Sequence, residues 1–140
     1  LSKDHPRIGT SMDNLAAAYG ALGRHEEALV LQEHVLEFNK HVLPKDHPHI
    51  ATSMGNLAAT YGALGRHEEA LVLKEQVLEF NKRVLPKDHQ HIGTSMGNLA
   101  ATYGELGRHE EALVLQEQVL EFDKRVLRKH KTSSFRSTRG

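Results

Sequence analysis

Residues 56–73 read NLAATYGALGRHEEALVL, and nearly the same letters occur at residues 14–31 and 98–115. Outward from this stretch, the segment 43–84 is repeated at 85–126 with changes at only five positions: Gln90, Gly93, Glu105, Gln116 and Asp123. A unit this short cannot bury its apolar surface alone, so it must stack on its neighbours. The sequence therefore predicts an array of three repeats at 1–42, 43–84 and 85–126.

The apolar spacing predicts two helices in each repeat. In the first repeat, one stripe with a period of 3.6 residues consists of Ile8, Met12, Leu15, Ala16, Tyr19 and Leu22. This helix is expected to begin near Pro6, with Asp4 as its cap, and to end at Gly23. The second helix then carries a broad stripe of Ala28, Leu31, Val35, Phe38 and Val42. The predicted fold class is all-α, with about six helices.

The end of the second helix differs between the repeats. Pro44 and Pro86 are expected to end it in the first two, because the proline ring cannot accept the internal helix hydrogen bond. Arg128 stands at that position in the third repeat, so the last helix is predicted to continue through Lys129 and Lys131. We expect residues 127–140 to be a basic C-terminal extension, a helix end followed by a disordered segment.

Composition excludes several classes of protein. The chain of 140 residues has no Cys, which excludes disulfides and zinc–thiolate sites. No apolar run is long enough to cross a bilayer, and the N-terminal residues resemble neither a signal peptide nor a transit segment. A cytoplasmic location and no membrane association are therefore expected. Residues 128–140 carry five basic residues and no acid, but a frayed end is the simpler interpretation, and we expect no nucleic-acid binding.

The sequence contains no recognisable catalytic or metal-binding motif. The 11 His residues follow from duplication of one unit, and they are interpreted as solvated or capping groups. The His25–Glu27 triplet HEE lacks the second His of a zinc-protease helix. The Ser residues lie in no nucleophile elbow, and the Gly residues form no phosphate-binding loop. We therefore predict a protein that is not an enzyme and needs no metal or cofactor.

The repeated stretch resembles the tetratricopeptide repeat, most closely the 42-residue variety found in kinesin light chains and in sensor arrays of signalling proteins. The resemblance covers residues 1–126 and rests on a large, Leu, small, Tyr, Gly, Ala pattern, which is matched here by Met54, Leu57, Ala58, Tyr61, Gly65 and Ala70 and by the same types in the other two repeats. It implies a right-handed α-solenoid of three helix-turn-helix repeats whose first helices line a concave groove. It also implies a protein-interaction role.

The side chains expected in that groove are small and mostly neutral. Asn14, Asn56 and Asn98 recur once per repeat and carry both a donor and an acceptor, so they could bind the backbone of an extended peptide. The alternative is that each Asn bonds a carbonyl of the neighbouring repeat. No Arg or Lys pair resembles a carboxylate clamp, so no affinity for an acidic C-terminal peptide is expected. Threonines complete the predicted peptide-binding set: Thr10, Thr52, Thr94, Thr60 and Thr102.

Both ends of the array present internal-type faces. The first helix of repeat 1 and the second helix of repeat 3 carry apolar stripes with no predicted partner, whereas repeat proteins usually end in polar capping helices. Head-to-tail or end-to-end self-association is therefore expected. Two functions follow. The first is a scaffold that binds an extended or helical peptide, and the alternative is a structural, self-associating array that is a fragment of a longer sensor region.

Overall fold

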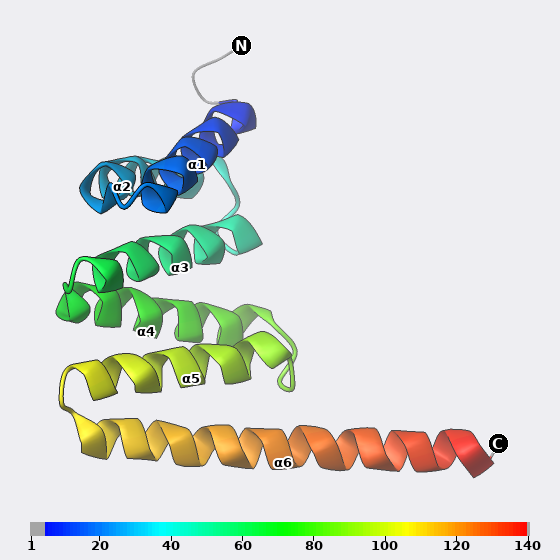
Figure 1. Cartoon of the computed structure of the whole chain (residues 1–140). Coiled ribbons are helices and arrows are strands. Elements are labelled where there is room, and N and C mark those ends of the chain that lie inside the picture. Colours follow the sequence, from blue (N-terminus) through cyan, green and yellow to red (C-terminus); the bar gives the residue numbers. More distant parts are fainter. Residues whose placement is uncertain (1–4, 140) are drawn as a thin grey trace. The chain divides into compact units, whose positions relative to one another are not determined.

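The structure is a computed structural model that describes the backbone of residues 5–139 and the side chains of residues 5–131. Within these residues it contains six helices and no strand: α1 (Pro6–Ala21), α2 (His25–Val42), α3 (Pro48–Ala63), α4 (His67–Val84), α5 (Gln90–Glu105) and α6 (His109–Arg139). Each repeat is one helix-turn-helix pair (Figure 1). The predicted all-α fold of helix-turn-helix repeats is thus confirmed.

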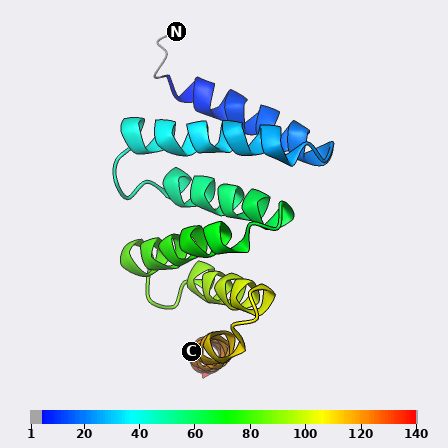
Figure 2. The ribbon, with the colours of Figure 1, turned by 90° about the vertical axis from the view of Figure 1, so that its left-hand side faces the viewer.

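The chain divides into two compact units, residues 1–80 and 81–140, with the boundary in the last turn of α4. In the first unit α1 packs on α2 and α2 packs on α3, and in the second α5 packs on α6. Figure 2 shows α1 to α4 stacked in chain order. The core of the first unit is made of small and aliphatic side chains from successive helices: Ala16, Ala28, Val35, Met54, Leu57 and Ala58.

The first helix of each pair begins at a histidine rather than at the expected aspartate. His47 is the N-cap of α3, and its Nδ1 accepts a hydrogen bond from the backbone N–H of His49 at 3.1 Å. His5 and His89 cap α1 and α5 in the same way. The expectation of an aspartate cap was wrong because the last non-helical residue before the helix is the histidine, one position after the aspartate. Asp4 itself lies outside the described residues.

The C-terminal helix is longer than expected. The helix α6 continues through Arg139, whereas the sequence predicted a helix end followed by disorder. Arg128 replaces the proline that ends α2 and α4, and no Pro or Gly interrupts the chain until Gly140. No helix in the described part of the chain combines the length and apolarity that a bilayer crossing requires.

Candidate functional site

A groove in the N-terminal unit contains several residues of the predicted peptide-binding set. It has a volume of about 310 Å³ and lies between α1 and α3, beside the end of α2. Phe38 and Asn39 of α2 contribute to its lining. Polar side chains of α1 and α3 provide most of the rest: Thr10, Asp13, Asn14, His49, Thr52 and Ser53. The structure therefore brings Thr10, Asn14 and Thr52 together around one hollow.

The three predicted asparagines are exposed, and no side-chain amide among them has a hydrogen-bond partner within the described residues. The alternative interpretation required each Asn to bond a carbonyl of the neighbouring repeat, and the structure contains no such bond at Asn14, Asn56 or Asn98. Each exposed amide can therefore offer both its donor and its acceptor to a ligand.

The five predicted threonines fall into two groups. Thr10, Thr52 and Thr94 are exposed. By contrast, Thr60 and Thr102 are buried, and each hydroxyl donates to a backbone carbonyl one turn earlier, Asn56 O and Asn98 O, at 3.2 Å. These two side chains are not accessible to a ligand in this structure, contrary to the expectation. Helical periodicity had placed them beside the exposed face, but their burial depends on the helices packed around them.

Asp13 gives the N-terminal groove a charge that the sequence reasoning did not select. The equivalent positions are Gly55 and Gly97, so this carboxylate belongs to the first repeat alone. Burial raises the pKa of the Asp13 carboxyl, and the nearby His49 imidazole partly opposes that rise. No hydrogen bond or ion pair to Asp13 occurs among the described residues. The only signal in the sequence was the change from Gly to Asp between the repeats.

A larger hollow, of about 830 Å³, lies in the C-terminal unit between the end of α4, α5 and α6. Its lining mixes apolar side chains with charges of both signs, including Met96, Phe122, Lys82, Glu121 and Arg125. No pattern in the sequence indicated this hollow, because its residues come from three helices at no common spacing. A lining with both charge signs selects no particular ligand chemistry.

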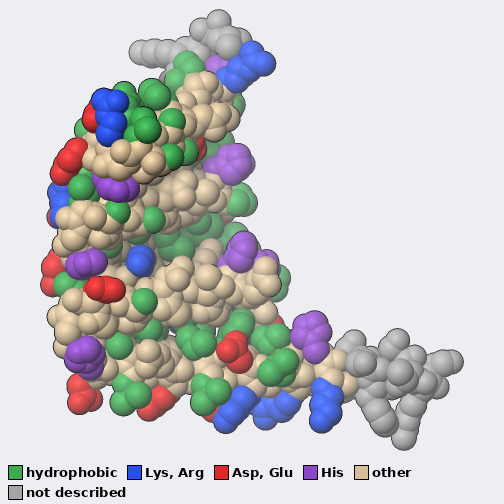
Figure 3. All heavy atoms as spheres, viewed as in Figure 1, with side chains coloured by type: hydrophobic (Ala, Val, Ile, Leu, Met, Phe, Trp, Pro, Cys, Tyr) green, Lys and Arg blue, Asp and Glu red, His purple; other side chains and the backbone are tan. Residues whose placement is uncertain are grey.

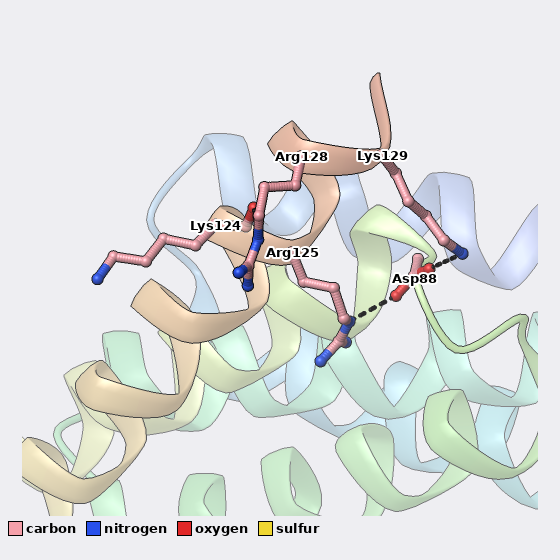
Figure 4. Close-up of polar contacts among 5 residues, drawn as sticks. All are labelled: Asp88, Lys124, Arg125, Arg128 and Lys129. Atoms are coloured by element: carbon pink, nitrogen blue, oxygen red, sulfur yellow. Dashed lines mark hydrogen bonds and ion pairs between the residues drawn. The ribbon is translucent and has the colours of Figure 1, made fainter. Parts of the chain in front are cut away.

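The same unit contains an ion-pair cluster around Asp88, in the loop between α4 and α5 (Figure 4). Its carboxylate accepts a hydrogen bond from Arg125 Nε at 2.8 Å and a second from Lys129 Nζ. Lys129 and Arg125, in that order of effect, lower the pKa of the Asp88 carboxyl. The cluster ties the continuation of α6 to the loop that precedes α5.

The histidines show no arrangement suited to metal binding. The rings of His47 and His49 meet edge to face with centroids 4.6 Å apart, and His47 Nδ1 is engaged in the helix cap. No group of three His, Asp or Glu side chains in the described part of the chain is placed to hold a metal ion. The role that the structure shows for His5, His47 and His89 is helix capping.

Comparison with known families gives two matches that together cover most of the chain. A family model described as tetratricopeptide repeat matches residues 49–125, and a second with the same description matches residues 8–49. The search of curated proteins found no match.

Solved structures of repeat arrays resemble the chain. One from Podosopora anserina, described as nearly identical TPR-like repeats of a kinesin light chain, is 34% identical with a TM-score of 0.79 and covers 90% of this chain and 60% of its own. BtubC from P. vanneervenii is 18% identical (TM-score 0.78, 88% of this chain, 49% of its own). The TPR domain of Arabidopsis FLU is 22% identical (TM-score 0.70, 83% of this chain, 94% of its own).

The last two likenesses show the fold alone. The chain spans about 60% of the length of the Podosopora anserina structure. Together with the family matches, these results confirm the resemblance that the repeated sequence indicated. The chain belongs to the tetratricopeptide-repeat family, and its 42-residue repeats are similar to those of kinesin light chains.

Proposed function

We propose that this chain is a non-catalytic scaffold that binds an extended segment of a partner protein in the groove between α1 and α3. Tetratricopeptide repeats generally serve as protein-interaction modules, which supports the general role. The observation that carries the specific proposal is the exposed side chain of Asn14, which lines that groove and whose amide has no partner among the described residues. The cytoplasmic location stays a prediction.

The chemistry of the groove favours a neutral or basic segment. An Asn amide can donate to a peptide carbonyl and accept from a peptide N–H, which suits an extended backbone that has no internal hydrogen bonds. Asp13 adds an acceptor that is strongest toward a Lys or Arg side chain. The Asp13 carboxylate also repels an acidic segment, in agreement with the expectation that acidic C-terminal peptides do not bind.

The test uses fluorescein-labelled ten-residue peptides of scrambled neutral sequence that contain either one central Lys or one central Glu. Fluorescence anisotropy should detect tighter binding of the Lys peptides, and Asn14→Ala should weaken their binding at least tenfold. Gln76→Ala, an exposed amide on α4, is the matched control and should leave binding unchanged. Equal loss in both variants, or no peptide bound at millimolar concentration, contradicts the proposal.

The contribution of Asp13 is tested separately. Asp13→Asn should abolish the preference for the Lys peptide over the Glu peptide. It should not change the affinity for a peptide of the same scrambled sequence that carries neither Lys nor Glu. A Lys preference that survives this substitution would mean that another group selects the charge.

A second candidate function is self-association of the repeat array, with or without further repeats in a longer protein. The observation that favours it is the exposure of apolar side chains at both ends of the array. Leu15 on α1 is 48% exposed, whereas Leu57 at the same repeat position is 4% exposed. On α6, Leu113 and Leu120 are 51% and 55% exposed.

A further inference from the structure

The junction between α2 and α3 shows how two successive repeats of this sequence pack. Apolar side chains of both helices are buried there: Leu29, Leu36, Ile50, Met54 and Leu57. Two polar contacts accompany them. Asn39 Nδ2 donates to Ser53 Oγ at 2.7 Å in a buried position, and Tyr61 Oη donates to Glu33 Oε1 at 3.1 Å. The junction therefore combines an apolar seam with two directional bonds.

One half of such a junction lies uncovered on α1. A hollow of about 310 Å³ is lined by Arg7, Ile8, Ser11, Met12 and Leu15. All five residues have equivalents 42 positions later on α3, which are His49, Ile50, Ser53, Met54 and Leu57, and Tyr19 is the equivalent of Tyr61. The face of α1 that corresponds to the packed face of α3 therefore carries the same set of positions, but no helix among the described residues covers it.

The other half lies uncovered on α6. Leu113 and Leu120 are the equivalents of the buried Leu29 and Leu36, and Glu117 is the equivalent of Glu33. Asp123 stands where Asn39 binds Ser53. Figure 3 shows apolar side chains between charged ones along the edge of α6 that faces away from α5. The spacing of Leu113, Leu120 and Leu127 places one apolar side chain every two turns.

We propose that the second candidate function takes the form of head-to-tail stacking, in which α6 of one copy packs on α1 of the next as α2 packs on α3. In this arrangement the α6 face of one copy and the α1 face of the next are aligned in the same register as α2 and α3 within one chain. The Ser11 hydroxyl then donates to the Asp123 carboxylate, and Tyr19 Oη donates to Glu117. Such a contact is heterologous, so each added copy leaves one free face at each end.

The test is light scattering after size exclusion, over a wide range of protein concentration, on the wild type and on two variants. Leu15→Lys blocks the α1 face and Leu120→Lys blocks the α6 face. Because both leucines are half exposed, circular dichroism should show an unchanged fold. Each variant alone should stay at the mass of one chain, and an equimolar mixture should form a 1:1 pair that does not grow, since only one intact α1 face meets one intact α6 face.

The control is Val30→Lys, since Val30 on α2 is 55% exposed but lies outside this seam, and it should associate like the wild type. The proposal depends on the second candidate function, and the two fail in different ways. A wild type that stays a single chain at every concentration removes both. A wild type that associates while the single variants still associate with themselves removes the head-to-tail arrangement and leaves self-association standing.

Discussion

At the scale of single residues, the turn between the two helices of each pair contains one glycine with a positive φ, and any other residue there would lower the stability of the fold. Gly65 has a φ of 75°, and Gly23 and Gly107 have nearly the same value. In this conformation Gly65 N–H donates to Gly62 O at 3.0 Å and Arg66 N–H donates to Tyr61 O at 2.8 Å. These two bonds are the Schellman motif, which satisfies carbonyls that the helix end leaves free. The turn therefore depends on the left-handed backbone.

Two alanine substitutions in this turn should have opposite effects. Gly65→Ala should lower the free energy of unfolding by about 1 kcal/mol or more, because a Cβ atom disfavours the left-handed region. Gly62→Ala, inside α3 with no atom near the added Cβ, should raise it by about 0.5–1 kcal/mol. Urea unfolding followed by circular dichroism measures both. A stabilised Gly65→Ala variant would show that the turn does not need a positive φ.

The buried amide of Asn39 gives a second residue-scale prediction. Its bond to Ser53 lies at the α2–α3 junction, so Asn39→Ala leaves that hydroxyl without its donor and should cost about 1–3 kcal/mol in urea unfolding. Asp123→Ala, at the same repeat position but exposed, should change stability by less than about 0.5 kcal/mol. Equal losses of stability in the two variants would show that the hydrogen bond between Asn39 and Ser53 contributes nothing to the free energy of unfolding.

At the scale of elements, α6 differs from α2 and α4 because no proline follows it at the end of its repeat. Arg128 allows the helix to continue, and the continuation brings Lys129 onto Asp88, where Arg125 already donates a hydrogen bond. The second helix of a repeat thus ends within the repeat where Pro44 or Pro86 follows it, and it continues where Arg128 stands at that position. The ion-pair cluster then holds this part of α6 against its own unit.

The lowered pKa of Asp88 makes that attachment sensitive to acid. A carboxyl whose pKa is depressed on folding adds stability above its ordinary pKa of about 4, and that stability is lost as the pH falls through the depressed value. The NMR titration midpoint of the Asp88 carboxyl carbon should therefore lie below about 4. It should return to the ordinary value when Arg125 and Lys129 are both changed to Gln.

A consequence for thermal unfolding follows from the same contact. The wild type should be more stable than Asp88→Asn at neutral pH, and their melting temperatures should converge at low pH. A difference that is the same at both pH values would show that the carboxylate charge has no part in holding α6.

At the scale of the whole molecule, identical residues have different roles because of their place in the array. Leu15 and Leu57 occupy the same position in repeats that are nearly identical, yet only Leu57 is buried, on a helix that packs against α2 of the preceding repeat. Burial in a stacked array is set by the neighbouring repeat as much as by the residue itself. Stability should therefore be distributed unevenly along the chain.

This unevenness can be measured with one pair of substitutions. Leu57→Ala should cost about 2–5 kcal/mol in urea unfolding, because it opens a cavity in a packed junction. Leu15→Ala should cost less than about 1 kcal/mol when it is measured at a concentration where the chain does not associate, since half of that side chain already faces water. Similar costs at the two positions would mean that the exposed face of α1 is covered in solution.

The sequence by itself determined the three repeats, the six helices, the glycine turns and the continuation of the last helix past Arg128. These features depend on local periodicity and on the φ preferences of Pro and Gly, which are properties of neighbouring residues in the chain. The apolar stripes without a predicted partner on α1 and α6 also follow from comparing one repeat with the next, whereas the sequence left open whether the asparagines are exposed.

Only the tertiary structure decided which side chains are accessible and which are paired. Thr60 and Thr102 follow the same periodicity as the exposed threonines, yet the helices packed around them bury both. Similarly, Asp88 is held by residues 37 and 41 positions away, and burial raises the pKa of the Asp13 carboxyl against the opposing effect of His49 on another helix. Contacts between separate helices are not encoded in the spacing of either one, so they could not be derived before the helices were packed.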